Sequence, residues 1–351
     1  MIPPAARSTL HELEPGYFAL VMATGIVSIA MVGHQPSVIT DALLWLALIE
    51  YAVLVGLHAW RLVVHRDAVA RDLAEPRRAF GMLTFVAATD VLGARIAMDG
   101  HDAAGLVLLL VGSLAWLVLG YAVPWVAASG RGRRPALQDA DGTWFMWVVA
   151  GQSVAVLAAT LEPEVAEGGR ELALLAVVAW SIGVFLYAAA GIFVAARLLR
   201  YPVRPGDVTP PYWIAMGATA ITVVGGADIV RMSVYPVAIA VRDVVEGTVV
   251  LFWAFGTWLV PPLIAVGVWR HVRHRIPLTY EPALWSIVFP IGMYGVGSHY
   301  LGLAAHLPLI RDIGVHEVWV ALGVWLVTFF AMALHLAHPP ARPVTPGRRR
   351  L

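Results

Sequence analysis

The sequence contains no cysteine and no lysine among its 351 residues. Without cysteine, disulfide bonds, thiolate metal sites and thiol redox chemistry are all excluded. No glycine-rich phosphate-binding loop of the Walker or dinucleotide type is present, so nothing indicates that nucleotide hydrolysis drives the protein. The absence of lysine leaves two explanations open, a base composition that favours arginine codons and a functional preference for arginine.

Charged residues are also scarce, at 13% of the chain, whereas soluble domains contain about 25%. Hydrophobic residues make up 60% of the chain, and its mean hydropathy is +0.76. This composition predicts a protein that crosses the membrane several times. Residues 1–15 contain Arg7 and prolines but no apolar core, so we expect no cleavable signal peptide.

Ten apolar runs are long enough to cross a bilayer, which takes about 20 residues. Turn and charge signals such as RDLAEPRR, SGRGRRP and RHVRHRIP separate them. The runs lie at residues 16–33, 38–60, 79–98, 103–127, 143–160, 171–199, 212–234, 243–268, 282–305 and 314–337. We therefore predict an all-α membrane protein with one ten-helix domain, residues 1–340, followed by a short basic cytoplasmic tail, residues 341–351.

The arginines predict the orientation of these helices. Only five of the 24 lie in odd-numbered loops, namely Arg95, Arg170, Arg231, Arg242 and Arg311. The others lie near the termini or in even-numbered loops. Since cytoplasmic loops carry an excess of arginine, we expect both termini to be cytoplasmic in a protein of the cell's inner (plasma) membrane.

The odd-numbered runs resemble one another, which indicates five repeated helical hairpins. Each begins with an aromatic residue, and seven residues later each has a small one: Gly25, Ala87, Gly151, Ala220 and Gly292. Small residues suit close packing or a narrow lumen, whereas the even-numbered runs are rich in Leu, Val and Trp and suit lipid contact. We expect an inner ring of odd-numbered helices around a central pore and an outer ring of even-numbered helices. The positive N-terminal ends of the inner helices would then favour anions at the cytoplasmic mouth.

The ninth run, WSIVFPIGMYGVGSHY, contains a phenylalanine followed by a proline, Phe289 and Pro290. Pro290 has no N–H for the preceding turn, so a kink is expected, and a membrane helix tolerates one beside protein or a water-filled path. In the register of the repeats, Phe289 is level with four smaller residues, Met22, Thr84, Val148 and Gly217. A single large ring in this tier predicts a plug in the lumen. The alternative is an ordinary packing phenylalanine.

Ionisable residues inside membrane helices are costly and often functional. Arg95 and Arg231 are candidates to attract anions at the outer mouth, although Asp228 and Arg231, three residues apart, also suit a structural ion pair. Glu50 and His299 are candidates to couple a proton to transport. The alternatives are a structural partner between helices for Glu50 and a hydrogen-bonded interfacial residue for His299.

Catalytic and cofactor signals are missing from the sequence. No pair of histidines has the spacing of a metal or haem site, and no Ser–His–Asp set or carboxylate pair is evident. We expect no enzyme, no cofactor and no metal. Neutral donors on the inner helices favour anions held without a fixed countercharge, and they are Thr24, Ser28, Thr84, Gln152, Ser153, Thr219 and Thr222.

The first run, EPGYFALVMATGIVSIA, and the ninth, WSIVFPIGMYG, resemble those of the tellurite-resistance/dicarboxylate transporter family. That family includes the bacterial tellurite-resistance permease, the yeast malate permease and the plant slow anion channel. The resemblance covers nearly the whole chain. It implies five hairpins around a central pore, usually in a homotrimer, and a pore-occluding phenylalanine at Phe289.

The same resemblance implies transport of small anions or C4-dicarboxylates through the bilayer, by a channel or by a proton-coupled carrier. A sulfite or tellurite exporter of the same fold is an alternative. A membrane enzyme, a sensor and a scaffold without flux are alternatives of other classes. Nothing in the sequence indicates a nucleic-acid partner.

Overall fold

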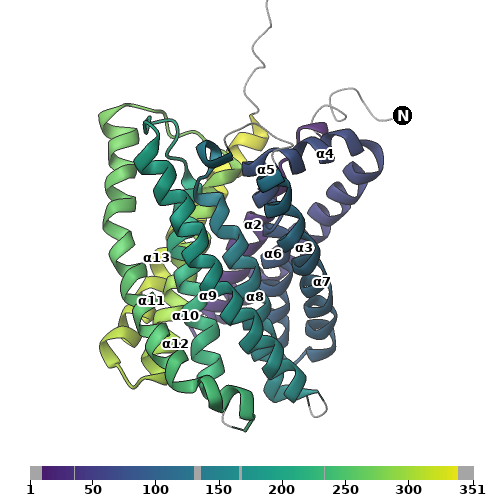
Figure 1. Ribbon diagram of the computed structural model, residues 1–351, viewed down its shortest axis with the longest axis vertical. Helices are drawn as coiled ribbons and strands as arrows, with labels where there is room; N and C mark the ends of the chain where they lie inside the picture. The colour runs from purple at the N-terminus through teal and green to yellow at the C-terminus, as the bar shows by residue number, and fades with distance from the viewer. Residues whose placement is uncertain (1–9, 35, 130–135, 166–167, 233, 339–351) are drawn as a thin grey trace, which may run out of the picture.

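The computed structural model describes residues 10–34, 36–129, 136–165, 168–232 and 234–338, and these ranges are helical with no strand (Figure 1). The prediction of an all-α membrane protein is confirmed. Within these ranges, nine helical segments are long and apolar enough to cross a membrane, and a shorter apolar helix covers Pro15–Met31. The predicted basic tail, residues 341–351, lies outside the described residues.

Five of these segments begin with a short turn and continue as a longer helix, and we call the longer helices the inner helices. η1 (Pro15–Phe18) leads into α2 (Ala19–Met31), α5 (Pro76–Gly81) into α6 (Thr84–Ala97), η3 (Gly142–Phe145) into α8 (Met146–Leu161), η5 (Pro210–Trp213) into α10 (Ile214–Arg231), and η7 (Pro282–Leu284) into α12 (Trp285–Ala304). Proline or glycine opens each turn, which suits a first turn whose N–H groups lack partners.

The remaining long helices alternate with the inner ones along the chain, and we call them the outer helices. They are α3 (Ser37–Val64), α7 (Asp102–Ser129), α9 (Gly169–Arg200), α11 (Pro236–Val268) and α13 (Pro308–Ala337). A short polar helix, α4 (Arg66–Ala74), joins α3 to α5, and a π-helical turn (Trp269–Arg273) extends α11. Short 3₁₀ turns cover Ala136–Asp139 and Glu162–Glu164.

Contacts between helices form a closed inner ring in the order α2, α6, α8, α10, α12 and back to α2. Each outer helix packs against the inner helix that precedes it in the chain. In each of the four inner segments from α6 to α12, 72% to 83% of the residues in an apolar stretch of 18 are buried. In the outer helices, the corresponding share is 11% to 39%. The inner helices are therefore sheathed by the outer ones.

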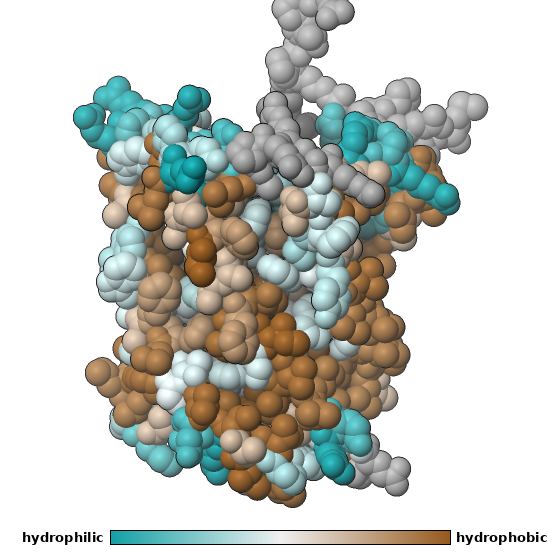
Figure 2. Space-filling model, in the orientation of Figure 1, coloured by the Kyte–Doolittle hydropathy of each residue, from teal (hydrophilic) through white to brown (hydrophobic). Residues whose placement is uncertain are grey.

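The outer helices expose large apolar side chains, among them Trp45, Trp125, Phe185, Trp258 and Phe330. Figure 2 shows hydrophobic residues over most of the middle of the molecule, with hydrophilic residues at its upper and lower ends. Such a band matches the hydrocarbon layer of a membrane between two polar interfaces.

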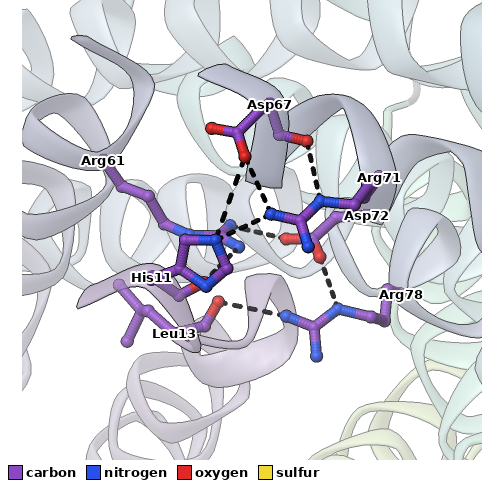
Figure 3. A network of polar contacts seen from close by, with 7 residues as sticks. All are labelled: His11, Leu13, Arg61, Asp67, Arg71, Asp72 and Arg78. Carbon is purple, nitrogen blue, oxygen red and sulfur yellow. Dashed lines mark hydrogen bonds and ion pairs between the residues drawn. The ribbon is translucent and has the colours of Figure 1, made fainter. Parts of the chain in front are cut away.

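We call the face at which the inner helices begin the proximal face, which is the upper one in Figure 1, and the opposite face the distal face. On the proximal face, Asp72 of α4 accepts hydrogen bonds from Arg61 at 2.5 Å and from Arg78 at 2.6 Å (Figure 3). The same arginines donate to the backbone carbonyls of His11 and Leu13. This buried network holds the segment that leads into η1.

Candidate functional site

A narrow cavity of about 40 Å³ lies between the distal halves of the inner helices. All five contribute to its wall: Ile26 and Ile29 of α2; Asp90, Val91, Ala94 and Met98 around α6; Ser153, Val156 and Thr160 of α8; Ile221, Val224 and Asp228 of α10; and Met293, Val296 and Tyr300 of α12. Apart from the adjacent Asp90 and Val91, these residues are three or four apart on each helix, so each helix presents one face to the cavity. We call this space the central cavity.

A second pocket, of about 320 Å³, lies on the proximal face among the turns that open the inner helices. Its wall includes Gly16, Thr84, Thr143, Pro211 and Ser286, one from each of the five segments. The Thr84 hydroxyl donates to the carbonyls of Gly81 at 2.7 Å and Pro15 at 3.3 Å, so it ties α6 to the turn before α2. We call this space the proximal pocket.

Phe289 lies between these two spaces. On α12 the proximal pocket ends at Ser286 and the central cavity begins at Met293, three residues before and four residues after Phe289. One turn before the cavity wall, the five helices place Met22, Ala87, Val149, Gly217 and Phe289, which we call the Phe289 tier. The Phe289 and Met22 side chains are each only 1% exposed. Neither space extends into this tier, so packed side chains separate them.

Counting one helical turn back from the wall of the central cavity puts Met22 and Gly217 level with Phe289, and the repeat register also names these two residues. On α6 and α8 the equivalent residues are Ala87 and Val149, whereas the sequence register gives Thr84 and Val148. Val148 is fully buried and lines neither space. The difference is one residue in α8 and about one turn in α6, because the turn before α6 is longer than those before the other inner helices.

The predicted small residues lie at contacts between helices and do not line the central cavity. A Cβ atom added at Gly25 would lie 3.0 Å from Val91, and one at Gly292 would lie 3.0 Å from Ile26. Gly151 faces the indole of Trp116 on the outer helix α7. Ala220 is buried against α12, where a Cβ at Gly297 would meet its carbonyl oxygen.

The sequence analysis missed most of the cavity wall, including Ile221, Val224, Met293 and Val296. Ser153 was named only as a neutral donor. A helical spacing of three or four residues could have identified them. In α2, α10 and α12 the first wall residue directly follows the small residue that the sequence pattern singled out.

α12 continues as one helix through Pro290, whose ring packs against Gly217 of α10. A Cβ atom at Gly217 would lie only 2.8 Å from the Pro290 ring. The two inner helices therefore approach each other closely at the Phe289 tier, and this contact fixes the position of α12.

Two carboxylates, Asp90 and Asp228, line the central cavity. From the sequence, only neutral hydrogen-bond donors were expected to face the lumen. The Ser153 hydroxyl donates to Asp90 at 2.8 Å, and Arg231 lies 3.5 Å from Asp228. The Arg231 side chain is largely exposed on the distal side, so solvent screens this pair. No arginine or histidine is part of the cavity wall as described above.

Arg95 is 1% exposed and lines neither space. Its guanidinium donates to the Ser28 hydroxyl at 3.0 Å and pairs with Asp99 at 2.6 Å and Asp41 at 3.9 Å. These partners neutralise its charge, so its structural role is to tie α6 to α2 and α3.

The other two coupling candidates lie in different places. Glu50 is buried on α3 beside Thr24 of α2, and neither of its carboxylate oxygens has a hydrogen-bond partner in the described part of the chain. It is not part of the wall of either space. His299 is half-buried near the distal end of α12.

The proximal pocket carries acidic residues at the starts of inner segments. Glu14, Glu75, Asp141 and Glu281 occupy the N-cap positions before η1, α5, η3 and η7. Burial raises the pKa of Asp141, which accepts from the Thr143 amide at 2.9 Å and pairs with Arg77 at 3.2 Å. The mouth therefore has charges of both signs in addition to the positive helix ends expected from the sequence.

No group of three or more His, Cys, Asp or Glu side chains suited to a metal ion occurs among the residues that the structure describes.

Comparison with known proteins assigns the chain to a family. An uncharacterized membrane protein of Mycobacterium tuberculosis is 63% identical over 153 residues, which cover 44% of this chain and 78% of that protein. Two uncharacterized transporters of Methanocaldococcus jannaschii are each 22% identical, over 326 and 329 residues, and the matches cover more than 90% of each chain. The family model described as voltage-dependent anion channel matches residues 12–333. The chain therefore belongs to the voltage-dependent anion channel family.

Proposed function

We propose that the protein moves small anions across the membrane through a pathway between the five inner helices, and that the Phe289 tier closes this pathway. The observation that carries the proposal is the placement of the proximal pocket and the central cavity, which end on either side of Phe289. Both spaces are lined by all five inner segments, so they lie in line along the bundle. The family assignment supports anion transport over catalysis.

Phe289 is the only large ring in its tier. Ala87 and Gly217 are too small to fill the space that removal of the Phe289 ring would leave. Gly217 also packs directly against the Pro290 ring. A movement of the Phe289 ring, or its truncation, would therefore join the two spaces. Buried side chains change rotamer in response to small shifts of their neighbours, which makes a single ring a suitable gate.

The orientation follows from the arginines. Those on the proximal face include Arg61, Arg66, Arg71, Arg77, Arg78, Arg197, Arg200, Arg204, Arg270, Arg273 and Arg275, whereas the distal face has Arg95, Arg170, Arg231, Arg242 and Arg311. The proximal face is then cytoplasmic and the membrane is the plasma membrane. A homotrimer is the assembly that the family resemblance implies.

The substrates are small inorganic anions or mono- and dicarboxylates. Asp90 and Asp228 in the cavity wall favour a proton-coupled carrier as the second candidate, because an anion beside an ionised carboxylate is repelled. Protonation of these groups removes the repulsion. A sulfite or tellurite exporter would use the same pathway.

The test is anion flux into proteoliposomes that contain the wild-type protein or Phe289→Ala. Flux through Phe289→Ala should rise at least about tenfold, since opening the tier removes a steric barrier of more than about 1.4 kcal/mol. Phe185→Ala is the matched control, because Phe185 is exposed on the outer helix α9. Equal flux through the wild type, Phe289→Ala and Phe185→Ala would refute the gate, and no flux through any of them would refute transport.

A further inference from the structure

A third space, of about 420 Å³, opens at the distal face between the loop after α2 and the helices α12 and α13. It shares four wall residues with the central cavity, Ile29, Met98, Val296 and Tyr300. The two spaces therefore adjoin at these residues. We call the third space the distal vestibule. Its volume is in the range of small-molecule sites, about 300–1,000 Å³.

Two histidines line the distal vestibule from different elements. His34 is in the loop after α2 and His299 is on α12, and both are half-buried. They lie close enough to interact electrostatically. Neither ring has a hydrogen-bond partner among the residues that the structure describes, and Nδ1 of His34 is enclosed as well. By contrast, Nδ1 of His58, which is also half-buried, is bonded to the Leu54 carbonyl at 2.9 Å. The ring nitrogens of the vestibule pair are therefore uncommitted.

We propose that His34 and His299 form a binding site for a small oxyanion at the distal entrance, and that the site binds when the imidazoles are protonated. The proposal rests on the proposed anion pathway and gives it an entry site. A protonated imidazole has two N–H donors and no acceptor, so two such rings offer a carboxylate or sulfonate oxygen only donors and positive charge. Hydrogen bonds from a charged donor to an oxyanion are stronger than neutral ones.

Among the described residues around the pair, Glu317 is the nearby carboxylate without an ion-pair partner, and it is not part of the vestibule wall. On α13, Arg311 lies near His299 and pairs with Asp312 at 3.1 Å. His316 is exposed and its Nδ1 is bonded to the Asp312 carbonyl, and Glu317 packs against Gly295 of α12.

The other elements add no free anion at the vestibule. At the end of α6, Asp99 is paired with Arg95. On α10, Asp228 faces the central cavity beyond Tyr300 and lies beside Arg231. Apart from His34 and His299, the residues of the vestibule wall are uncharged.

Trp319 provides an optical reporter for the site. Its indole packs edge-on against the ring of His34, with ring centroids 6.0 Å apart. Protonation of His34 and binding of an anion beside it should change the emission of Trp319. The protein has 14 tryptophans, so the signal is the difference between the wild type and Trp319→Phe.

The first measurement is concentration-dependent flux of methanesulfonate in proteoliposomes, with the distal side at about pH 5.5 or 7.5. Methanesulfonate is a small oxyanion whose own charge is constant in this range. We expect a half-saturating concentration about tenfold lower at the acidic pH, the effect of one charge-assisted hydrogen bond. His34→Gln and His299→Gln should each abolish the pH effect. His299→Arg, whose charge is permanent, should keep tight binding at pH 7.5.

His101→Gln is the matched control, because His101 is also on the distal face but lines a separate crevice beside α3. It should behave as the wild type. Half-saturation that does not change with pH, or equal shifts in His34→Gln and His101→Gln, would overturn the proposed site while leaving the anion pathway intact.

The second measurement separates failure of the site from failure of transport. Methanesulfonate is titrated into detergent-solubilised protein, and the Trp319 difference signal is followed at both pH values. If no variant shows flux but the signal saturates at pH 5.5 only when both histidines are present, the transport proposal fails and the binding site stands. No saturable signal at either pH in the wild type would overturn the site.

Discussion

Replacement of Asp228 by asparagine should increase anion flux, because its carboxylate lines the central cavity and repels an anion there. At about 5 Å and an effective dielectric constant of about 20, two like unit charges repel each other by about 3 kcal/mol. Arg231 lies 3.5 Å from the carboxylate but has a 65% exposed side chain, so it offsets only part of this repulsion. A remaining barrier of about 1.4 kcal/mol corresponds to a tenfold change in flux.

The assay is initial chloride flux in proteoliposomes, measured in a Phe289→Ala background so that the gate does not limit the rate. Asp228→Asn should raise flux about tenfold at pH 8 and by much less at acidic pH, where protonation neutralises Asp228 in the parent as well. Asp243→Asn, on the exposed surface of the outer helix α11, is the matched control. Flux through Asp228→Asn that is equal to or lower than that of the parent would refute the electrostatic argument.

Two further predictions concern stability. Gly217→Ala should lower the free energy of unfolding by about 1–3 kcal/mol, because the new Cβ atom would lie 2.8 Å from the Pro290 ring. Gly191→Ala is the control and should cause no such loss, because Gly191 has no neighbour within 4 Å. Chemical denaturation in detergent compares the two variants. Because burial raises the pKa of Asp141 above its ordinary value of 3.8, the folded state holds this proton more tightly and its contribution to stability is lost as pH rises through the raised pKa. Asp141→Asn should therefore reduce the fall in unfolding midpoint between about pH 4 and pH 7, and an unchanged slope would contradict this cause.

The sequence by itself determined the class of the protein. Apolar runs of about 20 residues must form helices in a membrane, since every backbone N–H and C=O group has to be bonded within the segment. All ten predicted runs coincide with helical segments to within a few residues at most ends. The difference between odd and even runs also has a physical basis, because small residues allow helices to approach closely and Leu-rich runs suit lipid.

Tertiary structure decided which side chains face the pathway and which charges are free. Neighbouring positions on a helix point about 100° apart, so a register wrong by one residue moves Gly151 from the lumen to a contact with Trp116. The pairing of Arg95 with Asp99, the uncommitted rings of His34 and His299 and the two carboxylates of the central cavity depend on contacts between helices that are distant along the chain. Local sequence carries the hydrophobicity that inserts each helix, whereas rotation about the helix axis is set by its neighbours.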